Sequence, residues 1–144
     1  MSEGKKVSPL FWVVGAVFLI WNAFGCYMYY LDKTLSDAKY AEAYGEPLAA
    51  IRDLYPAWAT AAYAIAVFGG LLAAILFLMR KKLALPVFVI SLIAAIISFS
   101  WGFMTPEFKE AAGGNHWVMP VVVIVIGLVE VFVTRMKVQK GILS

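Results

Sequence analysis

Glu130 is the residue best suited to take part in chemistry, because it is the one acid inside the four long apolar stretches of the sequence. An ionisable group within a membrane span is a candidate for coupling the movement of protons or substrate. Arg135 follows five residues later, which places Glu130 roughly 7 to 8 Å inside the cytoplasmic boundary at about 1.5 Å per residue. A carboxylate at that depth can reach headgroup water or pair with Arg80, Lys81 or Lys82. We favour this anchor or ion pair and keep a functional role as the alternative.

Asn22 is the other strongly polar side chain within a predicted span. It lies about 18 Å from the inner end of its helix, which predicts that Asn22 and Glu130 are not neighbours. An amide in hydrocarbon needs hydrogen-bond partners, and Ser98 and the Trp101 indole lie at comparable depth. We favour a contact between helices for Asn22 and keep a ligand-binding amide as the alternative.

Aromatic residues gather in the outer half of the predicted bundle. They are Tyr27, Tyr29, Tyr30, Tyr40, Tyr44, Tyr55, Tyr63, Trp21, Trp58, Trp101 and Trp117. An interfacial belt normally appears on both membrane faces. One-sided enrichment therefore also fits an outward-facing pocket for a sugar, quinone or lipid, or a docking surface for another subunit. A belt combined with loop packing is the favoured interpretation, and His116 is treated as an interface residue.

Several kinds of chemistry lack the residues that they need. Cys26 has no second cysteine, and His116 has no cluster of acids or cysteines near it, so the sequence predicts neither a disulfide nor a metal site. The chain also lacks a Gly-rich phosphate loop and a serine, histidine and acid set. We therefore predict a protein that is not an enzyme and that uses no cofactor.

Four transmembrane helices are the elements that position these residues. The 144 residues are 63% apolar and 15% charged, whereas soluble domains are roughly half apolar and a quarter charged. Crossing about 30 Å of hydrocarbon takes about 20 apolar residues. We place four such spans at approximately residues 10–30, 56–79, 84–104 and 117–134. The prediction is an all-α bundle of four transmembrane helices that forms a single membrane domain over residues 1–144.

The net charge of +3 is explained by membrane topology rather than by a nucleic-acid partner. Eight basic residues flank one side of the predicted spans and four flank the other. The positive-inside rule places the larger group in the cytoplasm, and with it both termini. The larger group is Lys5, Lys6, Arg80, Lys81, Lys82, Arg135, Lys137 and Lys140, and the smaller group is Lys33, Lys39, Arg52 and Lys109.

The segment between the first two spans, residues 32–55, is the longest predicted loop. Ala41, Tyr44, Leu48 and Ile51 recur at helical spacing, and Pro47 is suited to begin a new turn after Gly45. We predict one or two short amphipathic helices on the outer surface. Because the turn at residues 80–82 is very short, the second and third spans should form an antiparallel hairpin.

Small residues follow one face of each predicted span, as contacts between membrane helices favour. Those expected to pack helices together are Gly15, Gly25, Gly69, Gly70, Ala73 and Gly127.

Three passages of the sequence resemble one family. They are Trp21 to Gly25, Tyr55 to Gly70, and Arg80 to Pro86, and the likeness extends through Met119-Pro120 and the basic tail. The chain thereby resembles an uncharacterised family of small four-helix bacterial inner-membrane proteins, often labelled automatically as "sugar transporter". The resemblance implies a bacterial inner-membrane location and four spans, and it brings no catalytic residues with it.

Two classes of function fit these features. The favoured one is an accessory or structural subunit that packs against a larger membrane complex, or against copies of itself, within the bilayer. The alternative is a small oligomeric transporter for a sugar or another small solute, with an outward-facing aromatic pocket. In that alternative Asn22 contacts the substrate and Glu130 couples protons.

Overall fold

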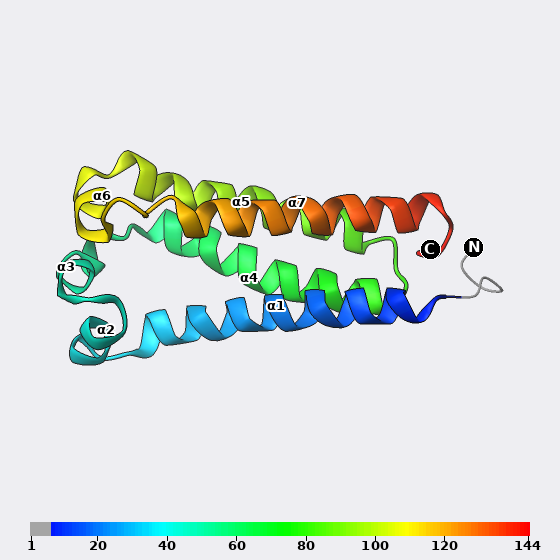
Figure 1. Cartoon of the computed structure of the whole chain (residues 1–144), viewed down its shortest axis with the longest axis horizontal. Coiled ribbons are helices and arrows are strands. Elements are labelled where there is room, and N and C mark those ends of the chain that lie inside the picture. The colour runs from blue at the N-terminus through cyan, green and yellow to red at the C-terminus, as the bar shows by residue number, and fades with distance from the viewer. Residues whose placement is uncertain (1–6) are drawn as a thin grey trace.

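The computed structural model describes residues 7–144, and these residues form helices and no strand. The four long helices are α1 (Pro9–Thr34), α4 (Ala57–Leu78), α5 (Ala84–Met104) and α7 (Val118–Gln139). They run side by side along the long axis of the molecule (Figure 1). The short elements α2 (Asp37–Tyr44), α3 (Glu46–Ala50), η1 (Arg52–Leu54) and α6 (Pro106–Ala112) gather at one end, called the loop end below. The opposite end is called the terminal end. The predicted all-α four-helix bundle is confirmed.

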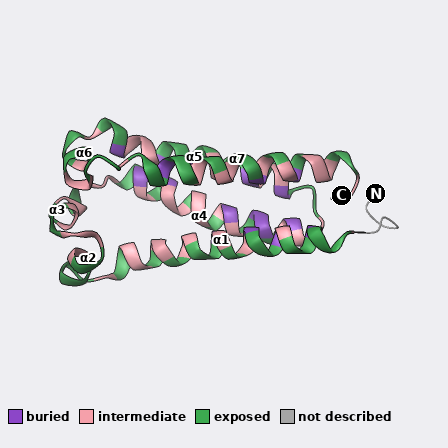
Figure 2. Cartoon of the chain, in the orientation of Figure 1, coloured by how far each residue is buried: buried purple, intermediate pink, exposed green. Residues whose placement is uncertain are grey.

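The four long helices contain 26, 22, 21 and 22 residues, and each is long and apolar enough to cross a membrane. Exposed residues cover their outer sides, and buried residues lie where the helices face one another (Figure 2). A surface of exposed apolar side chains on helices of this length is suited to lipid. The chain is therefore a multi-pass membrane protein in contact with the bilayer.

The helices pack in the order α1, α4, α5 and α7, and α1 and α7 make little direct contact with each other. The α4–α5 hairpin forms the largest interface, in agreement with the short turn seen in the sequence. Both helices carry fully buried alanines, among them Ala59, Ala73 and Ala74 of α4 and Ala84 of α5, and small side chains favour the close approach of membrane helices. The bundle is thus a curved row of helices whose two outermost members, α1 and α7, face each other across its interior.

Four phenylalanines fill the terminal half of the interior and are called the aromatic core below. The Phe77 ring stacks on Phe11 at a centroid distance of 4.7 Å, and it meets Phe18 edge to face at 5.4 Å. Phe18 also contacts Phe88 of α5 at 5.8 Å. Leu143, only 2% exposed, adds to this cluster. The aromatic core closes the bundle at the terminal end.

The chain after α7 folds back over the turn between α4 and α5. The Ser144 amide donates a hydrogen bond to the Arg80 carbonyl at 3.0 Å, and Arg80 Nε donates to the Ile142 carbonyl at 3.2 Å. Arg80 itself has a φ of 60°, an uncommon conformation for a residue with a side chain. These contacts tie the turn to the end of the chain.

Two turns with left-handed glycines shape the loop end. Gly45, with a φ of 96°, ends α2, and Pro47 lies in the first turn of α3, which matches the expected break between two short helices. The segment between α5 and α7, residues 105–117, holds a helix that the sequence reading missed, α6, which ends at Gly113 with a φ of 84°. The Phe108 ring of α6 lies against Gly102 of α5, where an added Cβ would be 2.9 Å from that ring.

Candidate functional site

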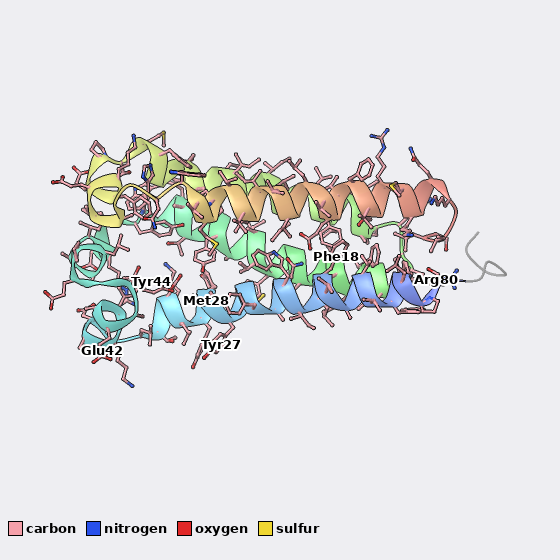
Figure 3. The ribbon with its side chains drawn as sticks, in the orientation of Figure 1. Phe18, Tyr27, Met28, Glu42, Tyr44 and Arg80 are labelled. Carbon is pink, nitrogen blue, oxygen red and sulfur yellow. The ribbon has the colours of Figure 1, made fainter. Side chains whose placement is uncertain are left out.

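A cavity of about 870 Å³ occupies the loop half of the bundle. All four long helices and the loop-end segments contribute to its lining, and it lies where α1 and α7 face each other without packing together. Met28 and Tyr44 point into this space, whereas Tyr27 points away from the bundle (Figure 3). The size is that of a site for a small organic molecule. The cavity can be described in three parts, namely a floor, a wall and a rim.

Asn22 and Glu130 form the floor of the cavity. Asn22 Nδ2 donates to Glu130 Oε2 at 2.6 Å and to the Phe18 carbonyl at 2.8 Å, so one amide links α1 to α7. Both side chains are buried, with exposed fractions of 7% for Asn22 and 5% for Glu130. The prediction that these two residues lie at different depths and are not neighbours is wrong.

The error comes from the end that was assigned to the fourth span. The sequence reading ended that span at residue 134, just before the basic Arg135, whereas α7 continues to Gln139. The long stems of arginine and lysine let their charges reach polar surroundings, so a base need not mark the end of a span. Counted from the loop end, Asn22 and Glu130 are each twelve residues from the ends of their helices, Thr34 and Val118, or about 18 Å.

Glu130 has no ion pair within residues 7–144. The predicted pairing with Arg80, Lys81 or Lys82 is therefore wrong, and a neutral amide takes the place of the base. A buried carboxyl without a cationic partner is a costly arrangement in a protein interior. One turn further along α7, Thr134 is fully buried, and its hydroxyl has no hydrogen-bond partner in the described part of the chain.

Gly70 of α4 makes room for the floor. A Cβ at Gly70 would collide with Asn22 Oδ1 and would lie 3.2 Å from Ser91 Oγ. At the adjacent Gly69, an added Cβ would meet only the Ser91 Cβ, at an ordinary 3.7 Å. Ser91 Oγ donates to the Ala66 carbonyl at 2.6 Å and so joins α5 to α4 beside the floor.

The wall of the cavity is aromatic. Tyr55 and Ser98 share a hydrogen bond of 2.7 Å between their hydroxyl oxygens, and the Tyr55 ring meets Trp101 edge to face at 5.0 Å. Trp101 in turn contacts Phe108 of α6 at 5.5 Å. Ser98 and Trp101, proposed as partners of Asn22, belong instead to this wall. Burial raises the pKa of the Tyr55 phenol and thus favours its neutral form.

Asp32 organises the rim, at the loop end of α1. Its carboxylate accepts hydrogen bonds from the Tyr44 hydroxyl at 2.5 Å and the Tyr63 hydroxyl at 2.9 Å. Burial, followed by the hydrogen bond to Asp32, raises the pKa of Tyr44 well above its usual value of 10.0. Arg52 Nη2 donates to the Asp32 carbonyl at 2.7 Å, and the guanidinium lies 4.4 Å from the centre of the Tyr40 ring. The sequence reading missed Asp32, and the clustering of tyrosines near the loop end was the signal that could have found it.

A lysine neighbours this acid. Lys33 Nζ lies 5.0 Å from the centre of the Tyr55 ring and 5.9 Å from that of Tyr29. It also donates to Thr60 Oγ1 at 3.3 Å. Lys33 and Arg52 of the rim therefore lie over tyrosine rings, an arrangement that cation–π attraction stabilises.

The remaining sequence candidates lie outside the floor pair. Cys26 donates its thiol proton to the Val67 carbonyl at 3.2 Å. The half-buried His116 lines the cavity, and its Nδ1 lies 3.0 Å from the Gly113 carbonyl. In the part of the chain that the structure describes, no three His, Cys, Asp or Glu residues lie close enough to hold a metal ion.

The glycines predicted to pack helices each face a neighbouring helix. A Cβ at Gly15 would collide with Leu78, one at Gly25 would lie 3.3 Å from Val67, and one at Gly127 would lie 2.7 Å from Leu92. Ala73 is fully buried.

Comparison of the chain with protein-family models, curated proteins and solved structures gives no match, so the chemistry of the cavity itself is the guide to function.

Proposed function

We propose that the protein binds a small solute in the loop-half cavity and acts as a small membrane transporter. The observation that carries this proposal is the difference between the two halves of the bundle. The loop half contains the cavity, the aromatic core fills the terminal half, and the buried pair of Asn22 and Glu130 lies between them. A ligand site near mid-membrane that is closed on one side is the arrangement that alternating access requires. This proposal replaces the accessory subunit as the favoured function.

The charge distribution supports an orientation for the proposed transporter. The bases that flank the terminal end outnumber those of the loop end, so the positive-inside rule puts the termini in the cytoplasm and the cavity on the outer side. The resemblance to small bacterial inner-membrane proteins supports the bacterial cytoplasmic membrane as the location. Because four helices leave little room for a substrate path, the transporter is proposed to work as an oligomer.

Neighbouring residues on α1 provide a matched test of the cavity. Met28 lines the cavity, whereas Tyr27 is 57% exposed and absent from the lining. Met28→Trp should place a bulky ring in part of the cavity and lower both ligand affinity and uptake at least tenfold, and Tyr27→Trp should leave both unchanged. The measurement is uptake of a panel of labelled sugars and other small solutes into proteoliposomes, with and without a proton gradient. Equal effects of the two substitutions would count against the cavity as the site.

The outermost helices give a specific reason to retain a subunit role as the second candidate. Large apolar side chains are exposed on α1 and α7, with fractions of 69% for Ile20 and 64% for Phe132. Such surfaces suit lipid, and they also suit the helix of another membrane protein. Co-purification of a defined partner from native membranes in mild detergent, lost in Ile20→Asn, would favour this role. An isolated protein that still takes up solute would exclude it as the main function.

A further inference from the structure

The charge of the cavity is carried by few groups. Two bases and two acids line the rim, Lys33 and Arg52 with Asp32 and Asp53, and their formal charges cancel. Glu130 is the remaining acid in the lining, so an ionised Glu130 gives the cavity a formal charge of −1 when His116, which also lines it, is counted as neutral. The cavity as a whole is thus complementary to a single positive charge.

The surroundings of Glu130 supply no such charge from the protein. From α1 it meets the neutral Asn22, and the Cys26 thiol on the same helix is bonded to a carbonyl of α4. Among titratable residues α4 carries Tyr63, whose hydroxyl donates to Asp32 at the rim, and α5 carries none. On α7 itself, Arg135 is exposed, and the half-buried Lys137 lies seven residues from Glu130, or about 10 Å along the helix. A carboxylate in this position needs either a proton or a cation from outside to neutralise it.

The polar side chains of the wall and rim are already engaged with one another. Ser91 donates to a carbonyl, Ser98 is paired with Tyr55, and the hydroxyls of Tyr44 and Tyr63 donate to Asp32. Few donors are left for a ligand with many hydroxyl groups, so these contacts argue against a sugar. Much of the rest of the lining is apolar and aromatic, including Trp21, Phe99 and Trp101, and Glu130 lies at its floor. Aromatic faces attract organic cations, and do so more strongly where water is excluded.

We propose that the cavity binds a lipophilic organic monocation, such as a quaternary ammonium compound or a protonated hydrophobic amine, with its charge at Glu130. This inference rests on the proposed function, because it names the ligand class of the same cavity. The carboxyl releases one proton as the cation binds and takes one up as the cation leaves, so charge balances at each step. Such a site exchanges a cation for a proton across the membrane.

The test uses the full chain in lipid nanodiscs and two probes of matched shape and opposite charge, tetraphenylphosphonium and tetraphenylborate. Isothermal titration calorimetry should show binding of the cation at least tenfold tighter than that of the anion. Titrations in buffers of different ionisation enthalpy should show release of close to one proton per cation at acidic pH. Equal binding of both probes, or binding without proton release, would overturn the inference.

Variants connect these readouts to Glu130. Glu130→Gln should weaken cation binding at least tenfold and abolish proton release. Glu130→Asp should retain both in part, which would show that the loss in Glu130→Gln is not caused by misfolding. Glu42→Gln is the matched control, because Glu42 is exposed on α2 and points away from the cavity (Figure 3). Unchanged cation binding in a folded Glu130→Gln protein would refute the inference.

The outcomes also distinguish a failure of this inference from a failure of the proposed function. If a neutral or anionic solute binds and Met28→Trp blocks it, the choice of a cation is wrong while the cavity remains the ligand site. If neither tetraphenylphosphonium nor any solute of the uptake panel binds, the proposed function fails together with the inference.

Discussion

Substitution of Gly70 by alanine tests whether the floor pair depends on the small residue beneath it. The added Cβ would collide with Asn22 Oδ1 and crowd Ser91 Oγ, so the Asn22 side chain must move and its bond to Glu130 is strained or lost. Overpacking of this kind costs about 1 to 3 kcal/mol. Alanine regains roughly 0.5 to 1 kcal/mol through its helix propensity. The midpoints of these two ranges leave an expected net loss of about 1.3 kcal/mol, or roughly eightfold in the unfolding equilibrium constant.

The neighbouring Gly69→Ala is the matched control for this experiment. Its Cβ would meet Ser91 Cβ at 3.7 Å without a clash, so the same change of residue should be neutral or slightly stabilising. The free energy of unfolding is measured by denaturant titration in mild detergent, with Asn22→Ala as a second background. Because the clash involves the Asn22 side chain, Gly70→Ala should cost less in that background, with a coupling energy of about 0.5 kcal/mol or more. Equal effects of the two glycine substitutions, or no coupling to Asn22, would refute the reasoning.

Three further outcomes are expected from the same unfolding measurement. Phe77→Ala leaves a cavity in the aromatic core and should lower the free energy of unfolding by about 3 kcal/mol or more. Phe132→Ala, at a position 64% exposed, should lower it little. Similar losses in the two variants would contradict the role of the aromatic core. The raised pKa of Tyr44 means that the folded state holds its phenolic proton more tightly, so stability is full below pH 10.0 and falls as pH rises above it. Tyr44→Phe should make that decline shallower, and an unchanged slope would count against the contact with Asp32. Gly45→Ala places a side chain at a φ of 96° and should cost about 1 kcal/mol or more; a neutral result would mean that the turn adapts.

The sequence was sufficient to predict the fold because lipid imposes strong rules on composition and length. Four apolar stretches and a very short turn determine the number of long helices and the α4–α5 hairpin. Helix α6 was missed because Pro106 and two glycines mark a loop as readily as the two ends of a seven-residue helix. Local signals of this kind do not separate the two cases.

The sequence singled out Asn22 and Glu130 as candidates, but the expected separation between them was wrong. Asn22 and Glu130 were selected because polar groups are rare in hydrocarbon, and that reasoning needs no coordinates. Their pairing was missed because depth was counted from the nearest base, and α7 continues past Arg135 to Gln139. The clustering of tyrosines near the loop end pointed to this region, but it could not show which of them contact Asp32, since Tyr44 and Tyr63 approach it from α2 and α4 only after the loop has folded.

The uneven packing of the bundle has a consequence for how it moves. Packed phenylalanines hold α1, α4 and α5 together at one end, while α1 and α7 are separated by the cavity toward the other. Segments with few buried contacts open locally at lower free energy than packed ones. Thermal fluctuation should therefore widen the loop end and leave the terminal end almost still, with the aromatic core as the pivot. Backbone amides near Met28 and Val123 should accordingly exchange hydrogen for deuterium well before those near Phe77.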